Sequence, residues 1–276
     1  MRSSGSGAIH DVGAGPAIVL IPGIQGRWEW MRPAIGALAT RWRVITCSLP
    51  GEPGVELLPE GNGNFESYVR HVDRLLDSAN LSDAVICGVS FGGLIALRYA
   101  ARRRERVRAL ILVSTPGPRW RPTPRQARHM RWPILNSPLF VLGAVKRGWS
   151  ELRVTLPYLG ERLAFCARLA IQVASAPGIP SRMSARARLA VEEHFENDCA
   201  RVAAPTLVIA GERDLDKVVR FDDTMCYVAS IPGAEFQLFE QTGHLGTASA
   251  PDRFAAIVSK FLSRLPDRTW PTTSAS

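Results

Sequence analysis

Short runs of apolar residues recur along this chain, and they constrain its fold more than any other feature. Six of them have the length and composition of buried strands: 17–21, 44–47, 84–87, 109–113, 206–210 and 235–239. Helical stretches such as 91–101 and 253–262 lie between or after them, and Tyr68, Val72 and Leu75 share one face of another. Continuous apolar strands that alternate with helices predict a mostly parallel, doubly wound sheet covered on both faces, which is an α/β fold.

The alternation of strands and helices stops between residues 116 and 203. Nine prolines fall between Pro116 and Pro180, and proline breaks helices because it lacks an amide donor and fixes φ. We therefore expect several short helices, including 161–174 and 185–196. The predicted organisation is an α/β core of residues 8–115 and 204–265, a helical cap or lid of residues 116–203, and flexible tails at 1–7 and 266–276.

Composition argues against several classes of protein. The net charge of +9 comes almost entirely from arginines spread along the chain without a nucleic-acid-binding motif, so no nucleic-acid partner is expected. No apolar run reaches the ~18 residues of a membrane helix, and residues 1–7 lack the apolar core of a secretory signal, which predicts a cytoplasmic protein without a transmembrane segment. Five cysteines at scattered spacings, without a CxxC pair, are expected to be reduced and structural.

The strongest local signal for chemistry is the segment Gly88-Val89-Ser90-Phe91-Gly92-Gly93. It follows one apolar run directly and precedes a helical stretch, and a GxSxG sequence in the context of strand, sharp turn and helix is typical of a nucleophilic serine. Gly88 and Gly92 are small enough for the strand and helix to approach each other closely. The alternative is a glycine-rich turn with an incidental serine.

A nucleophilic serine needs a base, and the base needs an acid that fixes its tautomer. His244 follows the predicted strand 235–239, and Asp214 follows the predicted strand 206–210, so all three residues should meet at the carboxyl edge of the sheet. Asp216 is the rival for the acid, and its greater distance from the strand end favours Asp214.

No metal or organic cofactor is expected. Glu193 and His194 lie in an acidic helical stretch that could suggest a metal site, but this stretch lacks the HExxH spacing that places two ligands on one helical face. Acyl transfer instead needs two donors for the negative oxygen of its intermediate. The predicted donors are the backbone N–H of Phe91, which begins the helix after Ser90, and that of Ile24, in the turn after the first apolar run.

With these residues in place, the chain resembles the α/β-hydrolase family, most closely compact bacterial members with a helical cap such as carboxylesterases and enol-lactonases. The resemblance runs from about residue 16 to 265 and includes the segment 43–51, which ends in Leu-Pro-Gly, and the segment 204–209 before the acid. The chain departs from the family at Pro22 (usually His), Val89 (often His) and Ser48 (usually Asp). The resemblance implies the α/β-hydrolase fold and does not carry over a substrate.

The expected function is hydrolysis of a carboxylic ester, lactone or thioester through an acyl-enzyme on Ser90. The same residues could serve an acyltransferase, a carbon–carbon bond hydrolase or a perhydrolase, and a ligand-binding protein with little turnover is an alternative of another class. The expected partner is a small ester-type substrate with an apolar acyl or aryl group, because Trp120, Trp132 and Trp149 fall in the predicted cap. Arginines beside them could instead form a basic face toward an anionic substrate or membrane surface, or be solvated. The oligomeric state stays open.

Overall fold

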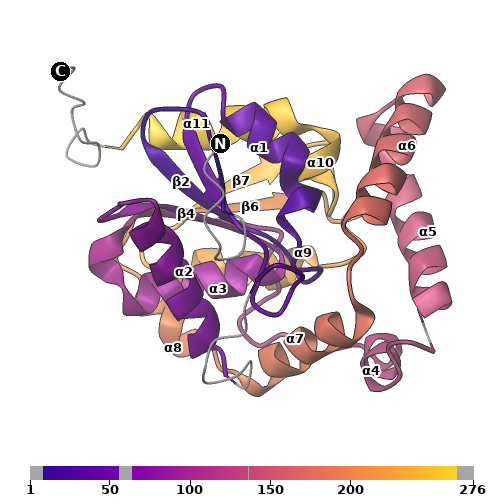
Figure 1. The fold of residues 1–276 in the computed structure, drawn as a ribbon, viewed down its shortest axis with the longest axis horizontal. Coiled ribbons are helices and arrows are strands. Elements are labelled where there is room, and N and C mark those ends of the chain that lie inside the picture. Colours follow the sequence, from indigo (N-terminus) through magenta and orange to yellow (C-terminus); the bar gives the residue numbers. More distant parts are fainter. Residues whose placement is uncertain (1–8, 56–63, 136, 266–276) are drawn as a thin grey trace.

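The computed structural model describes residues 9–55, 64–135 and 137–265, so the predicted tails at 1–7 and 266–276 lie outside the described residues. Its centre is a sheet of seven strands in the order β1-β3-β2-β4-β5-β6-β7 (Figure 1). The strands are β1 (His10–Val12), β2 (Ala17–Ile21), β3 (Arg43–Thr46), β4 (Ala84–Val89), β5 (Val107–Val113), β6 (Thr206–Gly211) and β7 (Glu235–Phe239). Strand β1 is antiparallel to β3, and all other neighbouring pairs are parallel.

Helices cover both faces of the sheet, as the continuous apolar strands predict. One face packs against η1 (Trp28–Met31), α1 (Arg32–Leu38), α10 (Gly246–Ser249) and α11 (Pro251–Leu262), and the other against α2 (Glu66–Ser78), α3 (Phe91–Arg102), α8 (Glu196–Cys199) and α9 (Phe221–Ser230) (Figure 1). The short helix η2 (Arg104–Arg106) connects α3 to β5. Because side chains alternate along a strand, Ile18 and Leu20 of β2 join one apolar cluster while Val19 and Ile21 join the other.

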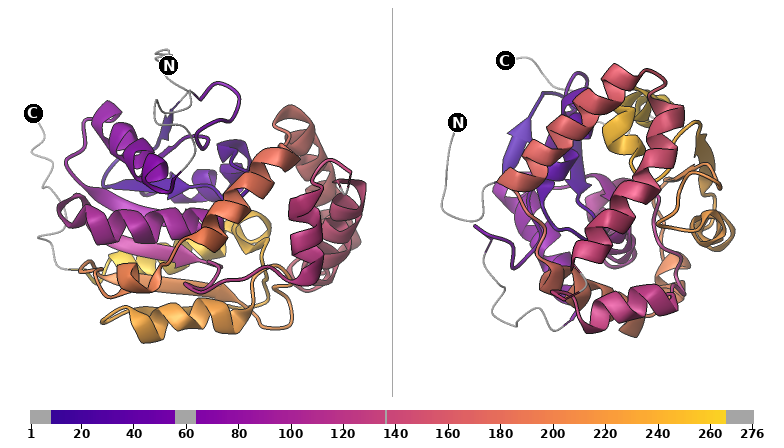
Figure 2. Two further views of the ribbon diagram at one scale, coloured as in Figure 1. Left: turned by 90° about the horizontal axis from the view of Figure 1, so that it is seen from below. Right: turned by 90° about the vertical axis from the view of Figure 1, so that its right-hand side faces the viewer.

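Four helices lie in the segment between β5 and β6, before α8: α4 (Pro124–Arg131), α5 (Ser137–Thr155), α6 (Leu159–Ser175) and α7 (Pro180–Glu192). We call the segment 116–203 the insertion. Figure 2 shows, in its right-hand view, that the insertion lies across one end of the sheet. No single described helix is long and apolar enough to cross a membrane, and α6 and α7 satisfy length and composition only as a pair bent by 92°.

The helix expected at 185–196 differs from the observed structure. Helix α7 begins five residues earlier, at Pro180, and ends at Glu192, and the separate helix α8 begins at Glu196. The break allows Phe195 to pack edge-on against Phe65, with ring centroids 5.0 Å apart. Burial of this aromatic side chain therefore outweighs the helical pattern of the sequence.

Candidate active site

Ser90 occupies a sharp turn between β4 and α3. Its backbone has φ 54° and ψ −122°, in the left-handed half of conformational space that residues other than glycine rarely adopt. Two hydrogen bonds hold the turn: Ser90 N–H donates to the Val113 carbonyl at 2.8 Å, and Gly93 N–H donates to the Ser90 carbonyl at 2.9 Å. The serine is thus fixed at the carboxyl end of a central strand, as the sequence predicts.

Glycine is required on both sides of this turn. A Cβ atom added to Gly88 would lie 2.2 Å from the Gly92 carbonyl oxygen, and one added to Gly92 would lie 2.4 Å from the Ile21 carbonyl oxygen. These separations are far below van der Waals contact, so any side chain would push α3 away from β2 and β4. The expectation that the two glycines permit close packing of strand and helix is therefore confirmed.

His244 meets Asp216 rather than Asp214, and this corrects the acid expected from the sequence. His244 Nδ1 lies 3.2 Å from Asp216 Oδ2, a hydrogen bond that fixes the tautomer of the imidazole. The Asp216 carboxylate is buried, and its Oδ1 accepts from the N–H groups of Val218 and Val219 at 2.9 Å each. Asp214 is exposed to solvent.

The reason for this correction lies in the path of the chain after β6. The N–H groups of Leu215 and Asp216 both donate to the Glu212 carbonyl at 3.0 Å, so residues 212–216 form one helical turn. Such a turn uses several residues while advancing the chain very little. The smaller distance of Asp214 from the strand end, measured along the sequence, therefore does not bring it nearer to His244.

The charges of His244 and Asp216 depend on each other. Burial disfavours both charged forms, but the carboxylate charge and its hydrogen bond outweigh burial at His244 and raise the pKa of the imidazole. For Asp216, burial acts to raise the pKa. The charge and the hydrogen bond of His244, together with the hydrogen bonds from the N–H groups of Val219 and Val218, outweigh burial, so this pKa lies below its ordinary value. The pair is arranged to favour an imidazolium beside a carboxylate, the state formed when a histidine accepts a proton.

The two predicted oxyanion donors border the Ser90 turn. Phe91 is the first residue of α3, where backbone N–H groups have no partner within the helix. Gly23 stands beside Ser90, since a Cβ atom on Gly23 would lie 3.5 Å from Ser90 Cβ, and Ile24 follows it in a turn closed by Gly26 N–H and the Gly23 carbonyl at 2.9 Å. Within the described residues, neither the Ile24 nor the Phe91 N–H donates a hydrogen bond.

Two charged residues of the insertion reach this region, and sequence reasoning missed both. Glu151 of α5 accepts from the Leu245 N–H with both carboxylate oxygens, at 3.0 Å each. Arg186 of α7 donates to the Ile24 carbonyl at 3.0 Å and pairs with Glu52 at 2.6 Å. A signal existed for Glu151 alone, because it is the one acidic residue among many arginines between positions 119 and 160.

A metal ion has no evident site among the residues that the structure describes. No group of three or more histidine, cysteine, aspartate or glutamate side chains there is placed to hold one. Glu193, a member of the cluster considered from the sequence, pairs instead with the guanidinium of Arg98 at 2.9 Å. Arg98 also binds Asp198 and lies 4.8 Å from the ring centroid of Phe195, so this acidic cluster attaches α7 and α8 to α3.

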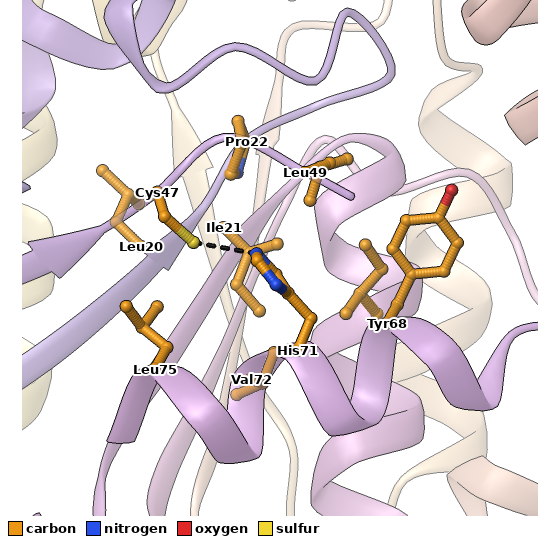
Figure 3. Close-up of a pocket in the computed structure, with 10 residues that line it drawn as sticks. Leu20, Ile21, Pro22, Cys47, Leu49, Tyr68, His71, Val72 and Leu75 are labelled. Carbon is orange, nitrogen blue, oxygen red and sulfur yellow. Dashed lines mark hydrogen bonds between the residues drawn. The ribbon is translucent and has the colours of Figure 1, made fainter. Parts of the chain in front are cut away.

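A small apolar pocket lies beside β2, and it is distinct from the Ser90 turn. Figure 3 shows its lining residues, among which Cys47 Sγ and His71 Nε2 are 2.9 Å apart. Burial raises the pKa of the Cys47 thiol to about 12 and lowers the pKa of His71 to about 4. Both groups are therefore neutral near pH 7, and the pair has neither the thiolate nor the basic imidazole that nucleophilic chemistry requires.

Known proteins of one family share this fold and this sequence pattern. A model of the Alpha/beta hydrolase family matches residues 18–257. The 2-hydroxymuconate semialdehyde hydrolase of Pseudomonas sp. (strain CF600) is 27% identical over 272 residues, covering 92% of this chain and 89% of that protein. The pimeloyl-[acyl-carrier protein] methyl ester esterase of Nitrosospira multiformis is 26% identical and covers 92% of this chain and 97% of that protein.

Solved structures agree with the sequence comparison. The enol-lactonase from Burkholderia xenovorans LB400 superposes with a TM-score of 0.75 at 22% identity, covering 93% of this chain and 96% of that chain. The likeness in structure supports the same arrangement of sheet and helices. Together with the family match over most of the chain, it shows that this chain belongs to the alpha/beta hydrolase family and has the α/β-hydrolase fold.

Proposed function

We propose that this α/β hydrolase cleaves a carboxylic ester, lactone or thioester through an acyl-enzyme on Ser90. In this proposal His244 is the general base and Asp216 is the acid that orients it. The observation that carries the proposal is the His244–Asp216 hydrogen bond of 3.2 Å, at the same edge of the sheet as the strained Ser90 turn. These are the parts that a serine nucleophile requires.

The chemistry follows from these groups in two steps. Ser90 Oγ attacks the carbonyl carbon while His244 Nε2 takes the hydroxyl proton, and the negative oxygen of the tetrahedral intermediate accepts from the N–H groups of Ile24 and Phe91. The intermediate collapses to the acyl-enzyme, and the leaving alcohol or thiol receives the proton from His244. Water then attacks the acyl carbon with His244 again as base, which releases the carboxylic acid and restores the serine. No metal or organic cofactor takes part.

The choice of an ester-type bond is supported by the names of two relatives, a methyl ester esterase and an enol-lactonase. A carbon–carbon bond hydrolase is the second candidate, because the same serine, histidine and acid could serve that reaction and one relative is named a semialdehyde hydrolase rather than an esterase or a lactonase. We further propose that residues 8–115 and 204–265 form the catalytic core and that 116–203 act as its cap. The partly exposed Trp132 and Trp149 of this cap would supply apolar surface for an acyl or aryl group.

An active-site probe tests the mechanism without knowledge of the substrate. We expect a fluorophosphonate to label the wild-type protein and not Ser90→Ala, and we expect Ser90→Ala to lower kcat on an aryl ester by ~10³- to 10⁶-fold. A folded wild-type protein that resists the probe and leaves both ester and carbon–carbon substrates intact would be a ligand-binding protein rather than a hydrolase. Product analysis on ester and carbon–carbon substrates then separates the two reaction classes.

The assignment of the acid has its own matched pair of variants. Asp216→Asn should lower kcat by about 10⁴-fold, because an amide at this position favours the wrong imidazole tautomer. Asp214→Asn makes the same change two residues away on an exposed side chain, and it should leave kcat nearly unchanged. The opposite ranking would return the role to Asp214 and contradict the geometry.

A further inference from the structure

Helix α5 of the insertion presents one face to the loop that carries His244. Gly148, Glu151 and Thr155 share this face, at the spacing of successive helical turns. Glu151 is only 1% exposed although it belongs to a helix whose neighbouring side chains at 149 and 150 are exposed. A carboxylate is rarely buried without a specific partner, so its contacts call for an explanation.

The contacts of this helix face lie on both sides of His244. Both oxygens of Glu151 accept from the N–H of Leu245, the residue after His244, at 3.0 Å. One turn further along α5, Thr155 Oγ1 donates to the Gln241 carbonyl at 2.7 Å, three residues before His244. At the other end of the face, a Cβ atom on Gly148 would lie 2.9 Å from Leu245 Cδ1, so the helix and loop are in close contact.

The Glu151 carboxylate also acts through its charge. Burial raises the pKa of Glu151 to about 7, even though the N–H groups of Leu245 and Gly243 and the charge of His244 act to lower it. The charged groups that face this centre are His244 and Asp216 from the loops of the core and Arg147 from α5 itself. Glu151 adds to the rise in the pKa of His244, whereas Arg147 opposes that rise.

We propose that Glu151 is a positioning residue for His244: its carboxylate holds the 241–245 loop in place through the Leu245 amide and favours the imidazolium during proton transfer. The inference rests on the proposed function, because it assigns His244 the role of base. In this proposal Glu151 contacts neither Ser90 nor the substrate. Its effect reaches the reaction through the orientation and the proton affinity of the imidazole.

The test is the variant Glu151→Gln, which keeps an oxygen acceptor for Leu245 N–H and removes the negative charge. We expect the rise of kcat/KM with pH to move to lower pH by at least about half a unit, because an anionic neighbour that favoured the imidazolium has been lost. In the wild type, the rise of kcat/KM with pH reflects the coupled titration of Glu151 and His244. In the variant, this rise should follow a simple one-proton curve. The same shift should appear when the His244 ring protons are titrated by NMR.

Two control variants separate charge from mere structural support. Thr155→Val removes an uncharged contact between the same helix and the same loop, and it should lower kcat by up to about 10²-fold while leaving the pH midpoint in place. Glu161→Gln removes an exposed acidic charge from α6, and it should change neither quantity. If Glu151→Gln does not fold, Glu151→Asp keeps the charge on a shorter side chain and should lower kcat without moving the midpoint.

The NMR titration makes the outcome independent of turnover. If Glu151→Gln leaves the pKa of His244 unchanged, Glu151 does not tune the base, whatever happens to kcat, and the proposal fails. If the pKa of His244 falls while the wild-type protein shows no reaction with fluorophosphonate, the electrostatic coupling stands and the proposed hydrolase function is what fails.

Discussion

Replacing Arg186 by methionine should destabilise this protein more than any substitution at an exposed arginine. Arg186 is 2% exposed on α7, and its guanidinium pairs with the buried Glu52 carboxylate at 2.6 Å while donating to the carbonyls of Ile24 and Pro50. Methionine fills similar space without a charge, so the change leaves Glu52 buried, and Arg182, 3.6 Å away, is then its one ion-pair partner among the residues that the structure describes.

The magnitude follows from the burial of both partners. Removing one member of a buried ion pair costs about 3 to 5 kcal/mol, because the remaining charge is left without compensation. At about 2 to 4 °C per kcal/mol for a protein of this size, the midpoint of thermal unfolding should fall by roughly 6 to 20 °C. Because Arg186 also holds the Ile24 carbonyl, kcat on an aryl ester should fall at temperatures where the variant is still folded.

Thermal unfolding followed by circular dichroism measures this loss. Arg188→Met is the matched control, since it makes the same change two residues away on an exposed side chain, and it should alter stability by less than about 0.5 kcal/mol. The double variant Arg186→Met with Glu52→Met removes both charges and should be more stable than Arg186→Met alone. An unfolding midpoint for Arg186→Met that equals that of Arg188→Met would refute the assignment of a stabilising buried pair.

Two further predictions concern the Ser90 turn and the base. Gly88→Ala should lower stability by about 1 to 3 kcal/mol or more and abolish labelling of Ser90, because the new methyl group would lie 2.2 Å from the Gly92 oxygen. Gly36→Ala is the control, since a methyl group there would meet no atom within 4 Å. Equal losses of stability in both variants would contradict the packing argument. The raised pKa of His244 predicts that kcat/KM rises with pH through a midpoint above about 6.5, since only the neutral imidazole accepts the serine proton. EDTA should leave this pH profile unchanged. Activity that a chelator abolishes and a divalent ion restores would overturn the metal-free mechanism.

The sheet could be predicted from the sequence because its strands carry a strong local signal. All six predicted strands are present, with ends that differ by at most two residues, and β2 and β7 have the predicted bounds. Strand β1 was not predicted: it has only three residues, with the half-exposed pattern of an edge, and its pairing with β3 is a contact between distant segments. Likewise, the Ser90 turn is encoded within six consecutive residues, so its geometry could be inferred locally.

The acid could not be assigned in the same way. Asp214 and Asp216 differ by two positions in a loop, and the choice depends on the turn that the Glu212 carbonyl closes with Asp216 N–H. No feature of the residue types alone determines that this segment coils rather than extends. Asp216 accepts hydrogen bonds from the N–H groups of Val218 and Val219. This pairing can be recognised only once the turn is known.

The insertion contacts both sides of the proposed site through buried groups of opposite charge. Arg186 binds the carbonyl of Ile24, whose own N–H is a proposed oxyanion donor, and Glu151 binds the N–H next to His244. Each contact joins residues that are far apart in the sequence, by 162 positions for Arg186 and by 94 for Glu151, so no local sequence pattern predicts it. A buried charge that loses its partner is costly, so moving α5 or α7 away from the core would expose or leave unpaired a charge at the site itself. Substrate access by such a movement would therefore also undo the geometry that the proposed reaction needs. Helices α4 and α6 are largely exposed and, among the described residues, make no buried charged contact of this kind with the proposed site.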